Sequence, residues 1–97
     1  MVCLGEFGRT PKINKKAGRD HWGACSSTLL AGGGIEGGRV LGASDKHGAF
    51  PTEDPFDPVD IQATMYHLLD LDPERMIQDH LGRPFPISSG EVIGELL

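Results

Sequence analysis

The chain has 97 residues, a formal net charge of −5 and a sequence pI near 5.2. A chain of this length forms at most one small domain, and it buries little more than ~60% of the surface that its unfolded form exposes. The acidic balance argues against a nucleic-acid-binding or membrane-surface protein, because both need a basic face to meet phosphate groups. The sequence has no run of about 18 apolar residues, so it predicts no membrane-spanning helix.

The first half of the chain alternates short predicted strands with loops. Residues 1–5 are apolar up to the glycine, which is typical of a buried strand in a parallel sheet. Residues 6–26 have no periodicity, and we expect them to form the loop that carries the site, since loops longer than about 12 to 15 residues are usually functional or disordered. Residues 27–31 and 39–42 predict two further strands, separated by a glycine-rich turn.

The clearest helix is predicted over residues 58–70. Asp57 can cap its N-terminus, and Pro58 suits the first helical position. Apolar side chains then recur at positions i, i+4, i+7 and i+8, which predicts a stripe that packs on a sheet. These side chains are Ile61, Met65, Leu68 and Leu69.

The C-terminal tail spans residues 73–97. A second short helix is predicted from Pro73 to about His80, with Gly82 as its stop. Turns and one amphipathic fragment are expected after it. Taken together, the predicted elements indicate an α/β fold in a single domain over residues 1–97.

Positive charge is concentrated in the predicted site loop. Five of the nine Lys and Arg residues lie within residues 9–19 of this otherwise acidic chain. One interpretation is a solvated surface loop. The other is that the loop provides positive potential for a phosphate or sulfate group, which Arg can bind through two parallel hydrogen bonds. Arg9 and Arg19 lie beside acidic residues and are the candidate anion-binding residues.

Three residues of the same loop are candidate metal ligands. Glu6 directly follows the first predicted strand, and open α/β sheets place their sites at the carboxyl ends of strands. His21 offers an imidazole, and Asp20 could either bind a metal or orient that ring. From the residues alone, helix capping or a salt bridge within the loop is the alternative. A zinc site that includes Cys3 and Cys25 is disfavoured, because the two cysteines form no Cys-x-x-Cys pair.

Five motifs taken together resemble the C-terminal part of a bacterial family known as domain of unknown function 1501. That family is in turn similar to the alkaline phosphatase and sulfatase superfamily. The resemblance implies an α/β three-layer sandwich, of which this chain would be the C-terminal portion and incomplete on its own. The motifs are Gly-Glu-Phe-Gly-Arg-Thr-Pro at 5–11, Gly-Arg-Asp-His-Trp at 18–22, Leu-Leu-Ala-Gly-Gly-Gly-Ile at 29–35, Gly-Ala-Ser-Asp at 42–45 and Leu-Gly-Arg-Pro at 81–84.

The resemblance also implies a metal site. In the superfamily a strand ends in an Asp-His-Gly motif whose Asp and His bind the catalytic metals, and a later His completes the site. The segment Glu6-Phe7-Gly8 looks like the counterpart of that motif, and His21 looks like the later ligand. Phe7 cannot replace an imidazole ligand, although Glu6 keeps the carboxylate. The resemblance thus implies a divalent metal, Zn or Ca, at Glu6, Asp20 and His21.

For function, the resemblance implies a fragment of a metal-dependent hydrolase of sulfate or phosphate esters. We expect the 97-residue chain to be inactive alone, because the segment with the superfamily's nucleophile is absent from it. The implied substrate of the longer protein is a small-molecule or polysaccharide ester, with no nucleic-acid or membrane partner, and relatives of this type carry export signals. The alternative is a non-catalytic binding or structural protein of the same fold, which Phe7 favours.

Overall fold

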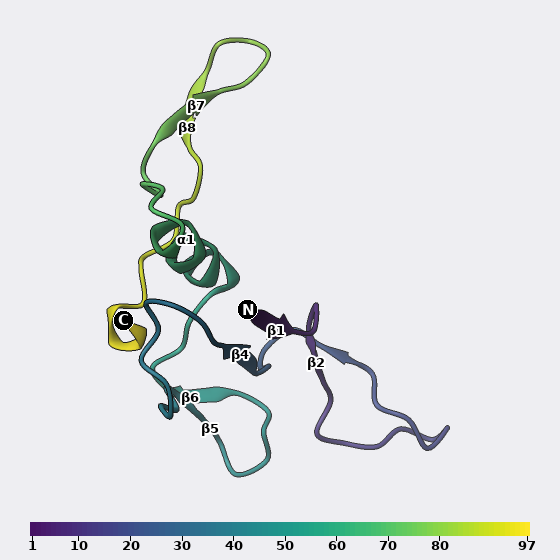
Figure 1. Cartoon of the computed structure of the whole chain (residues 1–97). Helices are drawn as coiled ribbons and strands as arrows, with labels where there is room; N and C mark the ends of the chain where they lie inside the picture. Colours follow the sequence, from purple (N-terminus) through teal and green to yellow (C-terminus); the bar gives the residue numbers. More distant parts are fainter. The chain divides into compact units, whose positions relative to one another are not determined.

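A computed structural model describes the whole chain, residues 1–97 (Figure 1). The chain divides into two compact units, Met1–Pro55 and Phe56–Leu97. The elements are four two-stranded antiparallel sheets, one α-helix and one 3-10 helix. Neither helix has the length and apolar character needed to cross a membrane.

The expected α/β three-layer sandwich is wrong. Each strand pairs with a single antiparallel partner, so no sheet has more than two strands. The apolar run at residues 1–5 does contain a strand, but an apolar run does not specify the direction of the neighbouring strand. The strand pairs only with an antiparallel partner, and Leu4 and Leu29 of the two paired strands are both exposed.

The first unit begins with a β-ribbon formed by residues 1–31. Strands β1 (Val2–Leu4) and β4 (Thr28–Leu30) pair at its base, and the Met1 and Ala31 backbones continue this pairing. Strands β2 (Gly8–Arg9) and β3 (His21–Trp22) pair farther along. The predicted site loop therefore contains a short ladder of its own.

The ribbon is irregular between its two ladders. Residues 5–7 on one arm lie between β1 and β2, whereas the longer segment 23–27 lies between β3 and β4 on the other. The chain passes close to itself here, because a Cβ atom on Gly8 would overlap the carbonyl oxygen of Cys25. Glycine is thus required at this position for a close approach of two backbones.

A second hairpin completes the first unit, with strands β5 (Ala43–Ser44) and β6 (Pro51–Glu53). The strand predicted at residues 39–42 is not present there, since pairing begins only at Ala43. Gly42 has a φ of +73°, and a Cβ atom on it would lie 3.0 Å from the Asp54 carbonyl oxygen. This backbone conformation turns the chain into the hairpin instead of extending the strand backwards.

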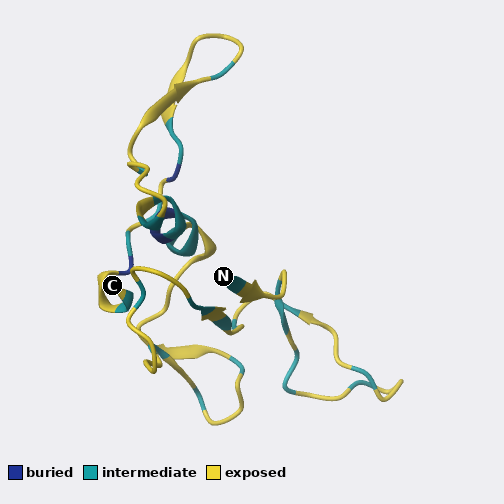
Figure 2. Ribbon diagram, viewed as in Figure 1, coloured by how far each residue is buried: buried dark blue, intermediate teal, exposed yellow.

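Helix α1 (Pro58–Leu68) organises the second unit. Its N-terminus is closed by a hydrogen bond in which the Asp57 amide donates to Asp60 Oδ2 at 2.8 Å, with Pro58 at the first position. Figure 2 shows that the buried part of the chain lies on α1 and on the C-terminal segment that follows the last strand. The buried residues are Ala63, Thr64, Ser88 and Ile93.

The short helix predicted from Pro73 to about His80 is wrong. Strand β7 (Met76–Gln78) occupies this position and pairs with β8 (Pro84–Pro86), and the 3-10 helix η1 (Gly94–Leu96) lies near the C-terminus. The Asp72 carboxylate accepts a hydrogen bond from the Glu74 amide, which closes a turn rather than starting a helix.

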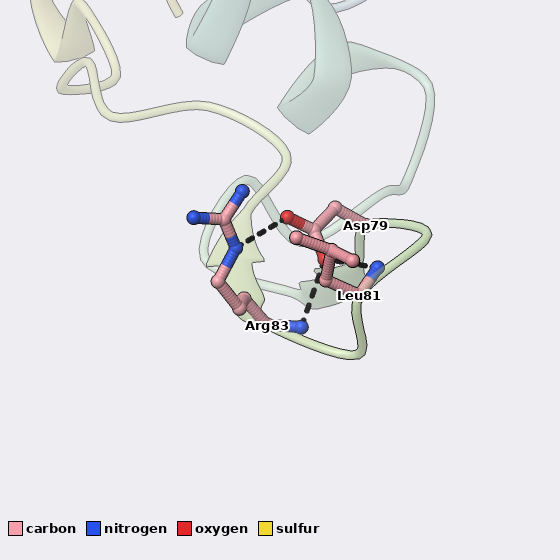
Figure 3. Close-up of polar contacts among 3 residues, drawn as sticks. All are labelled: Asp79, Leu81 and Arg83. Atoms are coloured by element: carbon pink, nitrogen blue, oxygen red, sulfur yellow. Dashed lines mark hydrogen bonds and ion pairs between the residues drawn. The ribbon is translucent and has the colours of Figure 1, made fainter.

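Three hairpin loops, at residues 14–18, 45–49 and 79–83, share one hydrogen-bonding pattern. In each loop the Oδ1 atom of the first residue accepts bonds from the amides of the third and fifth residues, at 2.8 to 3.1 Å. In each the fourth residue has a positive φ. Figure 3 shows the third of them, where the Arg83 guanidinium also binds the Asp79 carboxylate at 2.7 Å.

Two of these loops begin with a carboxylate whose titration is altered. The hydrogen bond from the Ala49 amide lowers the pKa of Asp45 below its ordinary value. The hydrogen bond from the Arg83 amide, together with the Arg83 guanidinium, likewise lowers the pKa of Asp79. In both loops the ionised carboxylate is therefore the form that the loop favours.

Candidate functional site

The pairing of β2 with β3 brings candidate site residues together. Arg9 lies directly opposite His21 in the ladder. The Phe7 and His21 rings are 4.0 Å apart between centroids, and the Arg9 guanidinium carbon lies 5.6 Å from the centroid of the Phe7 ring. Arg19 lies beside Arg9, because Arg9 Nη1 is 3.4 Å from the Arg19 carbonyl oxygen. We call this surface, formed by Phe7, Arg9, Arg19 and His21, the cationic face.

Backbone carbonyls hold both arginines of the cationic face. Arg19 Nη1 donates to the carbonyl oxygens of Thr10 at 2.8 Å and Pro11 at 2.7 Å. Arg9 Nη1 donates to the Arg19 carbonyl oxygen at 3.4 Å. A guanidinium has five N–H donors, so each arginine keeps free donors for a ligand. Both side chains are exposed, and neither forms an ion pair with a carboxylate.

Asp20 and Glu6 do not join the cationic face. Asp20 precedes β3: the Thr10 amide donates to the Asp20 carbonyl oxygen at 3.0 Å, and the Asp20 amide donates to Thr10 Oγ1 at 3.1 Å. The Asp20 carboxylate accepts a hydrogen bond from Asn14 Nδ2 at 3.0 Å. Glu6 is exposed in the bend between the two ladders.

This arrangement does not fit a metal held by Glu6, Asp20 and His21. Nowhere in the chain do three or more His, Cys, Asp or Glu side chains gather closely enough to hold a metal ion. The His21 ring packs on Phe7, and Asp20 is engaged by the Asn14 amide. Metal binding by these residues stays a prediction that the geometry does not support. Both cysteines are free thiols, Cys3 exposed and Cys25 half-buried.

Sequence reasoning missed a second feature of the first unit, a pocket beside Trp22. The Trp22 Nε1 donates to the Ala49 carbonyl oxygen at 2.6 Å, and its ring meets Phe50 edge-on, with 5.5 Å between centroids. These contacts join the ribbon to the hairpin of β5 and β6 and leave an open cavity of about 500 Å³. The cavity is lined by Thr10, Pro11, Lys12, Trp22, His47, Ala49 and Phe50.

The signal for this pocket was weak in the sequence. Trp22 is the chain's single tryptophan and follows a candidate ligand, but no spacing connects it with the loop at 45–50. That loop belongs to none of the predicted elements, although its Asp45-Lys46-His47-Gly48 run is a recognisable turn sequence.

Comparison with known proteins assigns the chain to a family. The family model described as protein of unknown function (DUF1501) matches residues 1–97. The chain belongs to this family. No curated protein and no solved structure matches it. Membership of the DUF1501 family confirms the resemblance carried by the five motifs, whereas similarity to the alkaline phosphatase and sulfatase superfamily stays a prediction.

Proposed function

We propose that this chain recognises the sulfate or phosphate group of an ester through its cationic face, and that the recognition serves an ester hydrolase. The observation that supports this most is the register of β2 and β3, which places Arg9 beside His21 and brings the Arg9 guanidinium to the Arg19 carbonyl. Arg9, Arg19 and His21 are thus neighbours in an otherwise acidic chain.

The chemistry of these side chains suits a tetrahedral oxyanion. Each guanidinium can donate two parallel N–H bonds to neighbouring oxygens of a sulfate or phosphate, and the His21 ring adds an N–H donor. The bonds from Arg19 to backbone carbonyls limit how far that side chain moves, so less conformational entropy is lost on binding. In a hydrolase, donors held in this way would also stabilise charge that develops on the oxygens in the transition state.

The relation to sulfatases and phosphatases belongs to the same proposal and rests on the sequence motifs. The alternative is a family member that binds the anionic group without hydrolysing it. Phe7 favours this alternative, because its ring packs against His21 at the position where the superfamily motif has a second imidazole.

Binding of inorganic sulfate and phosphate tests the anion site. We expect the double substitution Arg9→Gln and Arg19→Gln to weaken binding by about tenfold, since each of the two exposed charge-assisted contacts contributes about 0.7 kcal/mol and about 1.4 kcal/mol corresponds to a factor of ten. The matched control is Lys15→Gln with Lys16→Gln, which removes the same charge from the loop at 14–18. Equal weakening by both pairs, measured by NMR titration, would show a general charge effect and contradict the proposal.

Metal content and turnover separate the hydrolase from the binding protein. The assay uses the product of the complete open reading frame, purified without chelator, with 4-nitrophenyl sulfate and 4-nitrophenyl phosphate as substrates. Turnover that Arg9→Gln reduces would support the hydrolase. A metal-dependent hydrolase should be purified with close to one equivalent of bound metal. Sulfate binding without turnover, in a preparation with less than about 0.2 equivalents of Zn or Ca, would support the binding protein.

A further inference from the structure

The pocket beside Trp22 has a mostly apolar wall. Pro11, Ala49 and the rings of Trp22 and Phe50 form much of it. Phe50 is 53% exposed although its ring meets Trp22 edge-on, so this aromatic surface is open to solvent and not closed into a core. An open aromatic wall in a concave site is a common feature of small-molecule binding sites.

The polar atoms of the lining are of two kinds. Some already have partners within the protein: Trp22 Nε1 donates to a backbone carbonyl, and Thr10 Oγ1 donates to the Lys12 carbonyl and accepts from the Asp20 amide. The others are the side chains of Lys12 and His47, for which no hydrogen bond is present, although His47 lies within electrostatic reach of the Asp45 carboxylate. No carboxylate lines the pocket. The groups left for a ligand are therefore cationic or hydrogen-bond-donating.

From this combination we propose that the Trp22 pocket binds a small aromatic anion, that is, a planar ring with one carboxylate, sulfate or phosphate group. The ring lies against Trp22 and Phe50, and the anionic group meets Lys12 and His47. A saccharide fits less well, because its hydroxyl groups would lose hydrogen bonds to water and find few acceptors on this wall. A small inorganic anion would leave the apolar wall unused.

This pocket is separate from the cationic face. Trp22 and His21 are neighbours in β3, and their contacts lie on different sides of the ribbon: His21 packs on Phe7, whereas Trp22 reaches Ala49 and Phe50. The inference therefore does not depend on the proposed function, and a substitution at Arg9, whose guanidinium meets the Phe7 ring and the Arg19 carbonyl, should leave the Trp22 pocket intact.

The test uses the fluorescence of Trp22, which reports on this pocket without interference because the chain has no other tryptophan. The full chain is titrated with benzoate, with its neutral analogue benzamide, and with acetate. We expect benzoate to change the fluorescence in a saturable way and to bind about three- to fivefold more tightly than benzamide, the range of one exposed charge pair. Acetate should produce no saturable change.

Two variants with a matched control identify the groups responsible. Lys12→Met should remove the preference for benzoate over benzamide, whereas Lys15→Met, which removes the same charge outside the pocket, should keep it. Phe50→Leu retains apolar volume but should weaken both ligands. An unchanged fluorescence signal with benzoate, equal affinity for benzoate and benzamide, or an equal effect of the two lysine substitutions would each overturn the proposal.

Discussion

Ala17 has a backbone conformation that alanine rarely adopts. Its φ is 60°, and it occupies the fourth position of the loop at 14–18. The equivalent positions in the other two loops are Gly48 and Gly82, with φ of 66° and 75°. The left-handed conformation costs an L-residue about 1 to 2 kcal/mol, a penalty that glycine avoids.

We therefore expect Ala17→Gly to stabilise the loop at 14–18 by about 0.5–1 kcal/mol, after the greater entropy of glycine in the unfolded chain is subtracted. Gly48→Ala and Gly82→Ala should have the opposite effect on their loops. Nothing lies within 4 Å of a Cβ atom at either glycine, so their cost would come from the backbone alone. Amide hydrogen exchange of the three loops measures the change, and faster exchange in Ala17→Gly would contradict the argument.

Individual site residues were predictable only as chemical types. The basic cluster and the Asp20-His21 pair could be read from the sequence. Because residues 6–26 were predicted to be a loop, the sequence did not show that His21 and Trp22 are adjacent residues of a strand, whose side chains face opposite sides. The same error hid Trp22, whose side chain lies on the pocket side of β3. A short ladder inside a long irregular segment gives no periodic signal, because each strand has only two residues.

At the scale of elements, the hairpin loops predict a local response to acid. The pKa of Asp45 and the pKa of Asp79 are lowered from the ordinary value of 3.8 by amide hydrogen bonds to the ionised carboxylates. This stabilisation is complete above the ordinary pKa and is lost as the pH falls through the lowered pKa of the folded state. The loop at 14–18 begins with Asn14, an amide that does not titrate, and so provides an internal control.

We expect the loops at 45–49 and 79–83 to lose stability once the pH falls below 3.8 and to open as it passes through the lowered pKa of each carboxyl, while the loop at 14–18 is unaffected by titration of its first residue. Amide chemical shifts of the third and fifth residues of each loop report the change. Asp79→Asn keeps an Oδ1 acceptor, as Asn14 does, and should remove the acid response of that loop. A parallel response of all three loops would point to global acid unfolding instead.

The elements differed in how well the sequence predicted them. The helix was visible because three signals coincide at its start, namely Asp57, Pro58 and the apolar spacing that follows, and the structure begins α1 at Pro58. The hairpin of β7 and β8 was missed because Pro73 after Asp72 mimics a helix start. Pro84 and Pro86 at the edge of a two-stranded sheet also weaken the strand signal.

At the scale of the whole molecule, the fold class could not be derived from the residues. Short apolar runs predict strands without specifying partners, so the parallel sheet inferred from residues 1–5 was wrong, and the three-layer sandwich came from the resemblance alone. What the structure contains is local: every ladder joins two strands, and the buried side chains lie around α1. A chain organised in this way has strong local signals, such as caps and turns, and weak signals for long-range order.

The distribution of burial predicts which part of the chain is the most stable. No residue of the first unit is buried, whereas the second unit buries Ala63, Thr64, Ser88 and Ile93. Thr64 is central, since its hydroxyl donates to the Asp60 carbonyl at 2.7 Å and accepts from the Ile93 amide at 2.9 Å. Amides of α1 should therefore exchange more slowly than those of the ribbon at 1–31.

Thr64→Val tests this hierarchy, because it keeps the shape of the side chain but leaves the buried Ile93 amide without an acceptor. We expect a loss of about 1–3 kcal/mol in the second unit, seen as faster exchange in α1 and at Ile93. Thr64→Ser keeps the hydroxyl and should retain the Ile93 bond, at the cost of about 0.8 kcal/mol for the buried methyl group. If ribbon amides were as protected as those of α1, or if the valine and serine variants behaved alike, the stability of the chain would not depend on this buried hydrogen bond.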